Sequence, residues 1–148
     1  MSKSERYETL LKQFEALTSD EDSIQANMSN MIALVHREFD YWWTGFYFVE
    51  ANELVLGPFQ GPVACTRIEK GKGVCGTAWY QEKTQIVADV HQFPGHIACS
   101  AESNSEIVIP IKHNGNIIGV LDVDSTEFNC FDEIDERYLQ KMLSLIWK

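Results

Sequence analysis

The chain has 148 residues, and its 12 Lys and Arg against 22 Asp and Glu give a net charge of −10 at pH 7. This length fits one domain, and a hydrophobic content of 45% suits a globular protein with a real core. The acidic excess disfavours nucleic acids and anionic membrane surfaces as partners, because both attract clusters of Lys and Arg.

The chain carries no sign of export or membrane insertion. Its first residues, MSKSERYETLLKQFEAL, contain no apolar signal core, and no apolar run is long enough for a spanning helix. We therefore expect a protein of the reducing cytoplasm, where cysteines seldom form a structural disulfide framework. The four cysteines show no Cys-x-x-Cys spacing and the four histidines no His-x-x-x-His spacing, so we expect no metal site.

The N-terminal part of the chain predicts two helices. Apolar residues recur at helical spacing over residues 7–17 and again over 24–39, and the tripeptide Thr18-Ser19-Asp20 between them supplies turn and N-cap chemistry. From Trp42 the pattern changes to strands, with WWTGFYFV followed by a turn at 50–53 and by LVLGPF.

The middle of the chain predicts shorter elements. Residues 63–69 predict a strand, GKGVCGTAWYQEK a short helix after a glycine-rich turn, and TQIVAD another strand. Residues 89–105 show no period, and a loop of this length in a compact domain is often functional.

The C-terminal third predicts a β-hairpin and a helix. Asn114-Gly115 joins two β-prone runs in EIVIPIKHNGNIIGVLDVDS and suits a type I′ turn. The run DEIDERYLQKMLSLIW predicts a final amphipathic helix. Helices on both sides of a central antiparallel sheet define the α+β class, in a single domain over residues 1–148.

Acidic residues lie on both strands of the predicted hairpin. Glu106 begins the first strand, and Asp122 and Asp124 lie near the end of the second. Together with Ile118 and Val120, the two Asp residues share one face of their strand. An apolar stripe that turns acidic is typical of a pocket rim, and equally of a strand end that emerges into solvent.

Whether the three carboxylates meet depends on the register of the hairpin. Regular pairing from the predicted turn puts Glu106 opposite Val123 and therefore on the face away from both Asp residues. The same count puts Pro110 opposite Gly119, and both residue types favour irregular pairing. We expect a bulge there that brings all three carboxylates around one cavity.

The cysteines differ in their predicted surroundings. Cys99 lies in the long loop, Cys65 lies on a predicted strand, and Cys130 precedes the last helix, where we expect a small buried side chain. Cys75 lies where a glycine turn enters a helix, and a helix N-terminus lowers a thiol pKa, so local physics alone ranks Cys75 above Cys99 as the activated thiol. For Cys65, Cys75 and Cys99, reactivity and simple burial stay equally open at this point.

Three segments of the chain carry a family resemblance. WWTGFYFVEANELVLGPFQGPVACTRIEKGKGVCGTAW, FPGHIACSAESNSEIVIPI and GVLDVDS resemble the stand-alone GAF-domain enzymes called free methionine-(R)-sulfoxide reductases. The resemblance covers roughly residues 25–147 and leaves the helix within residues 1–20 outside. It implies a GAF-like fold, reduction of free methionine (R)-sulfoxide with thioredoxin as reductant, no bound cofactor, and a homodimer.

The resemblance also implies roles for the thiols. Cys99 is the expected nucleophile, Cys65 the resolving cysteine, and Cys75 an auxiliary thiol that relays the disulfide. Thiolate attack on the sulfoxide sulfur leaves a sulfenic acid, which condenses with a second thiol to a disulfide.

Other site residues follow from the same resemblance. Glu106, Asp122 and Asp124 are expected to contact the substrate, and Glu106 or one of the Asp residues to protonate the sulfoxide oxygen. Trp43 and Tyr47 are expected to wall the pocket.

Three alternatives remain at the level of sequence. A non-catalytic GAF sensor of a small ligand would keep its ligand affinity when the cysteines are replaced. A thiol peroxidase would turn over peroxide but not sulfoxide. A structural or adaptor protein would have no use for three cysteines in such motifs.

Overall fold

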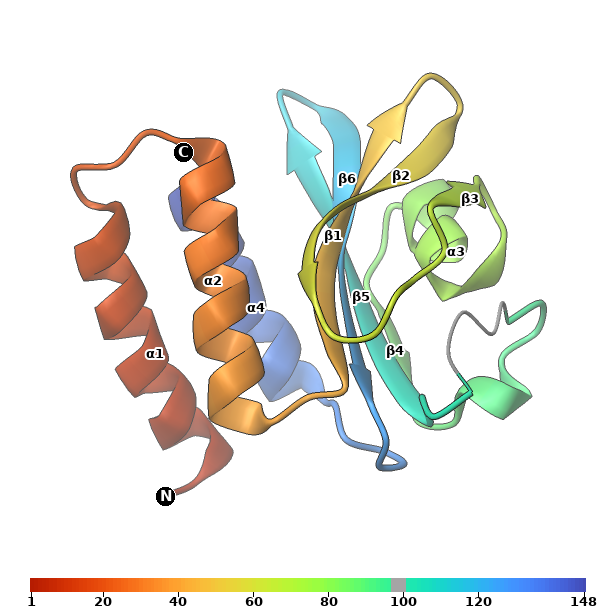
Figure 1. The fold of residues 1–148 in the computed structure, drawn as a ribbon, viewed down its shortest axis with the longest axis horizontal. Coiled ribbons are helices and arrows are strands. Elements are labelled where there is room, and N and C mark those ends of the chain that lie inside the picture. Colours follow the sequence, from red (N-terminus) through yellow and green to blue (C-terminus); the bar gives the residue numbers. More distant parts are fainter. Residues whose placement is uncertain (97–100) are drawn as a thin grey trace.

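The structure, a computed structural model, describes residues 1–96 and 101–148 and confirms the predicted α+β class (Figure 1). Its elements follow the predicted order. They are α1 (Lys3–Thr18), α2 (Ile24–Phe39), β1 (Trp43–Glu50), β2 (Glu53–Gln60), β3 (Arg67–Glu69), α3 (Gly73–Gln81), β4 (Gln85–Val87), the short 3₁₀ helix η1 (Val90–Gln92), β5 (Ser105–His113), β6 (Asn116–Ser125) and α4 (Glu133–Ile146).

Six strands form one sheet in the order β3-β2-β1-β6-β5-β4, and neighbouring strands pair antiparallel throughout. Helices α1, α2 and α4 lie on one side of the sheet, whereas α3 and the connecting loops lie on the other (Figure 1). The central strands β1 and β6 are therefore covered on both faces, which explains why WWTGFYFV is apolar without alternation. In the part of the chain that the structure describes, no helix combines the length and apolarity that crossing a membrane requires.

Side chains of the sheet alternate between two buried apolar clusters. On the helix side, Phe46, Ile107 and Leu121 pack with residues of α1, α2 and α4. The methionines of α2, Met28 and Met31, belong to this core as predicted. On the α3 side, the cluster contains the strand residues Trp43, Tyr47, Val108 and Val120 and the helix residues Val74, Cys75, Ala78 and Trp79.

One predicted helix cap and one predicted strand boundary were wrong. The side chain of Ser23, and not one of Thr18-Ser19-Asp20, caps α2 by accepting a hydrogen bond from the Ala26 amide. The strand predicted over 63–69 is confined to β3, because the chain leaves β2 through Gly61, at φ +131°, and returns to the sheet only at Thr66, whose carbonyl accepts from the Leu56 amide. The intervening residues form a loop over the α3 face.

The β5–β6 hairpin contains the expected bulge, one residue away from the expected place. His113 pairs with Asn116 as predicted, but Ile111 pairs with Gly119 and Lys112 with Ile117, which leaves Ile118 without a partner on β5. Beyond this extra residue, each side chain of β5 shares a face of the sheet with different β6 side chains than regular pairing would give.

The position of this bulge corrects two further predictions. Pro110 lies opposite Val120 rather than Gly119. Ile118 packs with the helix-side cluster, whereas Val120 lies in the α3-side cluster, so these residues do not share a face. The prediction that one extra residue brings Glu106 to the face of the two Asp residues was correct. The extra residue is Ile118, which lies between the pairs Lys112–Ile117 and Ile111–Gly119.

Candidate active site

A cavity lies on the α3 face of the sheet, between β1, β5, β6, α3 and the loop that follows β2. Its volume is about 60 Å³, enough for a few water molecules. Apolar side chains, among them Trp42, Trp43 and Val63, form its wall, whereas Cys75 and three carboxylates form a polar floor. A largely apolar hollow with a few convergent polar groups is the usual form of a small-molecule site.

The bulge brings the three predicted carboxylates to this cavity. Glu106 pairs with Asp124 across the hairpin, and Asp122 lies two residues before Asp124 on the same face of β6. All three line the cavity, and Glu106 and Asp122 are only 5% and 6% exposed. Their convergence confirms the geometric expectation, while their roles toward a substrate stay predictions.

Burial dominates the electrostatics of this cluster. It raises the pKa of Glu106 well above its usual value, and the neighbouring charges of Asp122 and Asp124 raise that pKa further. The pKa of Asp124 is raised for the same two reasons, although the Ser103 hydroxyl donates to its Oδ1 at 3.0 Å and lowers it. In the described ranges, no Lys, Arg or His side chain forms an ion pair with these carboxylates. The cluster therefore retains protons that exposed carboxylates lose.

Cys75 contradicts the ranking made from local sequence. It is the third residue of α3, as the glycine turn predicted, but its thiol is buried beside the carboxylates. Burial and the charges of Asp122 and Glu106 raise the pKa of Cys75 well above the usual value. Desolvation and three acidic neighbours outweigh the helix N-terminus, so Cys75 is not an activated thiol in this arrangement.

The remaining cysteines are placed as follows. Cys65 is part of a disulfide, whereas Cys75 and Cys130 are free thiols. Cys99 lies outside the described residues, so its predicted role as nucleophile stays a prediction. Cys130 is partly buried, and burial raises its pKa.

The two predicted wall residues of β1 have polar partners in the loop after β2. The Tyr47 hydroxyl donates to the Cys65 carbonyl oxygen at 2.8 Å, and the Trp43 indole Nε1 donates to the Pro62 carbonyl oxygen at 3.1 Å. Trp43 also stacks on Phe59 with ring centroids 5.2 Å apart. These contacts fix the loop that carries Cys65 to a central strand.

Sequence reasoning missed several residues of this site. Lys72, His96 and Ser103 line the cavity as well. All three lie within the segments that carry the family resemblance, but only the contact with Asp124 explains why a serine is useful at 103.

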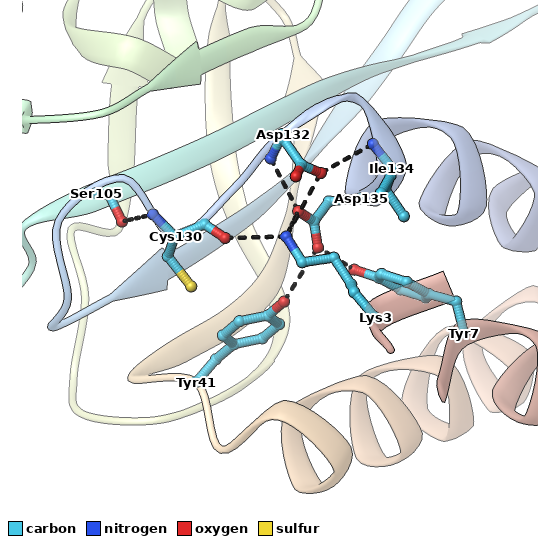
Figure 2. Close-up of polar contacts among 8 residues, drawn as sticks. All are labelled: Lys3, Tyr7, Tyr41, Ser105, Cys130, Asp132, Ile134 and Asp135. Carbon is cyan, nitrogen blue, oxygen red and sulfur yellow. Dashed lines mark hydrogen bonds and ion pairs between the residues drawn. The ribbon is translucent and has the colours of Figure 1, made fainter. Parts of the chain in front are cut away.

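A second buried polar cluster (Figure 2) lies on the helix side of the sheet, and none of its residues lines the cavity. Its centre is Asp135 of α4, which is fully buried and accepts from Lys3 Nζ at 2.7 Å and from the Tyr7 hydroxyl at 2.6 Å. The Tyr41 hydroxyl approaches the same carboxylate at 3.4 Å, and Lys3 Nζ also donates to the Cys130 carbonyl oxygen at 3.2 Å. This cluster joins α1 to α4 and serves the fold.

Comparison with known proteins agrees with the fold. The family described as "GAF domain" matches residues 21–148. The chain is 61% identical to GAF domain-containing protein A of Dictyostelium discoideum, over 98% of this chain and 92% of that protein. It is 48% identical to a free methionine-R-sulfoxide reductase of Escherichia coli, over 100% of this chain and 90% of that protein.

A solved structure gives the same result. The free methionine-R-sulfoxide reductase from Neisseria meningitidis, in complex with its substrate, superposes with a TM-score of 0.95 at 46% identity, over 99% of this chain and 89% of that one. The chain therefore belongs to the GAF-domain family, and within it to the free methionine-(R)-sulfoxide reductases.

Proposed function

We propose that the cavity on the α3 face binds free methionine (R)-sulfoxide and that the chain's thiols reduce it. As a member of the free methionine-(R)-sulfoxide reductases, the chain is an oxidoreductase that converts free methionine (R)-sulfoxide to methionine. The observation that supports this site best is the convergence of Glu106, Asp122 and Asp124 in one buried cavity beside the loop of Cys65.

The carboxylate cluster suits the cationic end of the substrate. An ionised carboxylate of the cluster would attract the ammonium group, because no Lys, Arg or His side chain of the described residues forms an ion pair with it. Trp43 and Trp42 offer apolar surface to the methyl and methylene groups. Backbone N–H groups of the glycine turn, together with Lys72 at the cavity, suit the substrate carboxylate.

The first chemical step transfers the sulfoxide oxygen to a thiol. The thiolate of Cys99 attacks the substrate sulfur while a carboxylic acid, Glu106 or one of the Asp residues, protonates the oxygen. This attack joins the two sulfur atoms in a four-coordinate intermediate. The protonated oxygen then shifts to the Cys99 sulfur, and the sulfur–sulfur and original sulfur–oxygen bonds break, so that methionine leaves and Cys99 keeps the oxygen as a sulfenic acid. The raised pKa of Glu106 supports its part, because a protonated carboxyl is needed at neutral pH.

The second step restores the enzyme. The Cys65 thiol displaces hydroxide from the Cys99 sulfenic acid, which forms a disulfide and, with one proton, releases water. The dithiol of thioredoxin then reduces this disulfide by exchange. Cys75 is the auxiliary thiol through which the disulfide can be relayed, although its raised pKa makes it a slow participant. No bound cofactor is needed, and we propose a homodimer in the cytoplasm.

The decisive experiment measures methionine release from each pure sulfoxide epimer, free and peptide-bound, with thioredoxin and its reductase. We expect turnover of the free R epimer alone. Turnover of hydrogen peroxide without sulfoxide reduction would indicate a thiol peroxidase. Ligand binding without turnover, unchanged by Cys65→Ser or Cys99→Ser, would indicate a sensor.

A further inference from the structure

We propose that Cys75, Glu106 and Asp122 form a binding site for a thiophilic divalent cation of the Zn²⁺ class. The Cys75 sulfur and one carboxylate oxygen each from Glu106 and Asp122 all lie within 4.8 Å of one another. In a tetrahedral zinc site, bond lengths of 2.0–2.3 Å place ligand atoms about 3.5 Å apart. Side-chain shifts of about an ångström therefore close these three atoms around one ion.

The state of Asp122 independently calls for a ligand. Its side chain is 6% exposed and lines the cavity, yet its Oδ1 atom has no hydrogen-bond partner among the described residues. Buried carboxylate oxygens are normally satisfied. A cation in the cavity would satisfy this atom, and about 60 Å³ is room for an ion with water in its remaining positions.

The donor set selects the type of cation. Two carboxylates without a described ion pair provide the negative charge, and Asp124 adjoins them as a further oxygen donor. A thiolate adds a soft donor, which favours Zn²⁺ or Cd²⁺ and is of no use to Mg²⁺ or Ca²⁺. The three ligands come from α3, β5 and β6, so no sequence spacing reveals them. On binding, the thiol proton and any proton shared by the carboxyls leave to solvent.

The site has a consequence for catalysis that rests on the proposed function. The same carboxylates are proposed to receive the substrate ammonium, so cation and substrate exclude each other. Zn²⁺ then acts as a reversible inhibitor that raises the apparent KM for methionine sulfoxide, and a chelator restores activity.

The binding test uses Cd²⁺ and the oxidised protein, in which Cys65 is part of a disulfide and Cys75 and Cys130 are free thiols. Titration should produce the ultraviolet charge-transfer absorption of a cadmium thiolate in the wild type and in Cys130→Ser. Cys75→Ser should lose it, and Asp122→Asn should weaken binding at least tenfold. Circular dichroism confirms that each variant is folded. Absorption that survives Cys75→Ser, or that vanishes with Cys130→Ser, would overturn the site.

The inhibition test uses the reduced enzyme and Zn²⁺. We expect the apparent KM to rise linearly with free Zn²⁺ from its metal-free value, with kcat unchanged. A fall in kcat at constant KM would overturn the competition even where cadmium binds at Cys75. Absence of turnover in the chelated enzyme would count against the proposed function, whereas the cadmium titration decides the metal site by itself.

Discussion

The hydroxyl of Tyr47 on β1 donates a hydrogen bond of 2.8 Å to the backbone carbonyl oxygen of Cys65. The bond connects a central strand, which lies between β2 and β6, to an irregular loop that carries the proposed resolving cysteine. The Trp43 indole holds the same loop at Pro62. The thiol of Cys65 is thus positioned by two aromatic side chains whose rings also belong to the cavity wall.

Tyr47→Phe should slow disulfide formation without slowing methionine release. The ring stays in place, but the loop loses a hydrogen bond worth about 1 kcal/mol, so we expect a loss of roughly fivefold in the rate of resolution. Single-turnover experiments measure methionine and remaining thiols in parallel. Tyr80→Phe, at an exposed tyrosine of α3, is the matched control. Equal slowing of both steps would mean that the hydroxyl acts on the substrate instead.

Glu106→Gln should impair sulfoxide reduction and stabilise the fold. Because burial raises the pKa of Glu106, the native state holds its proton where the unfolded state releases it. Wild-type stability therefore falls as pH rises from the unfolded pKa, about 4.3, through the raised native pKa. Glutamine does not titrate, so the variant does not lose stability in this way. The difference in free energy of unfolding between variant and wild type should therefore grow between pH 5 and pH 8, to about 1 kcal/mol or more.

Urea unfolding at both pH values, with a chelator present, checks this dependence. Glu50→Gln, at an exposed residue that ends β1, serves as control and should show no such gain. A variant less stable than the wild type at pH 8 would mean that Glu106 is ionised and well stabilised in the native cluster.

Local patterns in the chain were enough to predict the kinds and order of the main elements. The Asn114-Gly115 turn, the helical periods and the aromatic strand each correspond to an observed element. Each of these signals depends only on residues close together in the sequence. The aromatic strand is apolar on both faces because each face of the sheet is covered by an apolar cluster. A parity argument, beside the family resemblance, predicted that Glu106, Asp122 and Asp124 converge, and the hairpin confirms this convergence with the bulge one residue from its predicted place.

Long-range contacts account for what the sequence could not predict. The bulge leaves Ile118 unpaired, one residue before Gly119, whose backbone lies close to the Tyr47 carbonyl oxygen of β1, a contact that the hairpin sequence does not contain. The pKa of Cys75 is raised rather than lowered because the thiol is buried and because Asp122 and Glu106 approach from strands far along the chain. Tertiary burial outweighs local helix electrostatics in such a case.

Gly119→Ala should destabilise the protein strongly. A Cβ atom there would lie 2.4 Å from the Tyr47 carbonyl oxygen and 2.8 Å from the Phe48 ring, so β6 would have to move away from β1. We expect a loss of about 2–4 kcal/mol in the free energy of unfolding, and weaker activity because Asp122 and Asp124 move with β6. Gly115→Ala has no atom within 4 Å of its new Cβ and only the strain of φ +82°, so it should cost about 1 kcal/mol. Similar losses for both variants in urea unfolding would contradict the close approach of β6 to β1.

Asp135→Asn should cost stability and leave the chemistry intact. This carboxylate is fully buried and accepts from Lys3 Nζ and the Tyr7 hydroxyl, at the junction of α1 and α4 (Figure 2). Replacing it leaves Lys3 partly buried without its closest counter-charge, which we expect to cost about 2–4 kcal/mol, less than for a fully buried pair. Asp132→Asn, at the partly exposed N-cap of α4, should cost less than 1 kcal/mol, because asparagine also caps helices. Since the cluster lies across the sheet from the cavity, methionine release by folded Asp135→Asn should match the wild type. A selective loss of kcat in that variant, at a temperature where it remains folded, would show that the helix layer is coupled to the site.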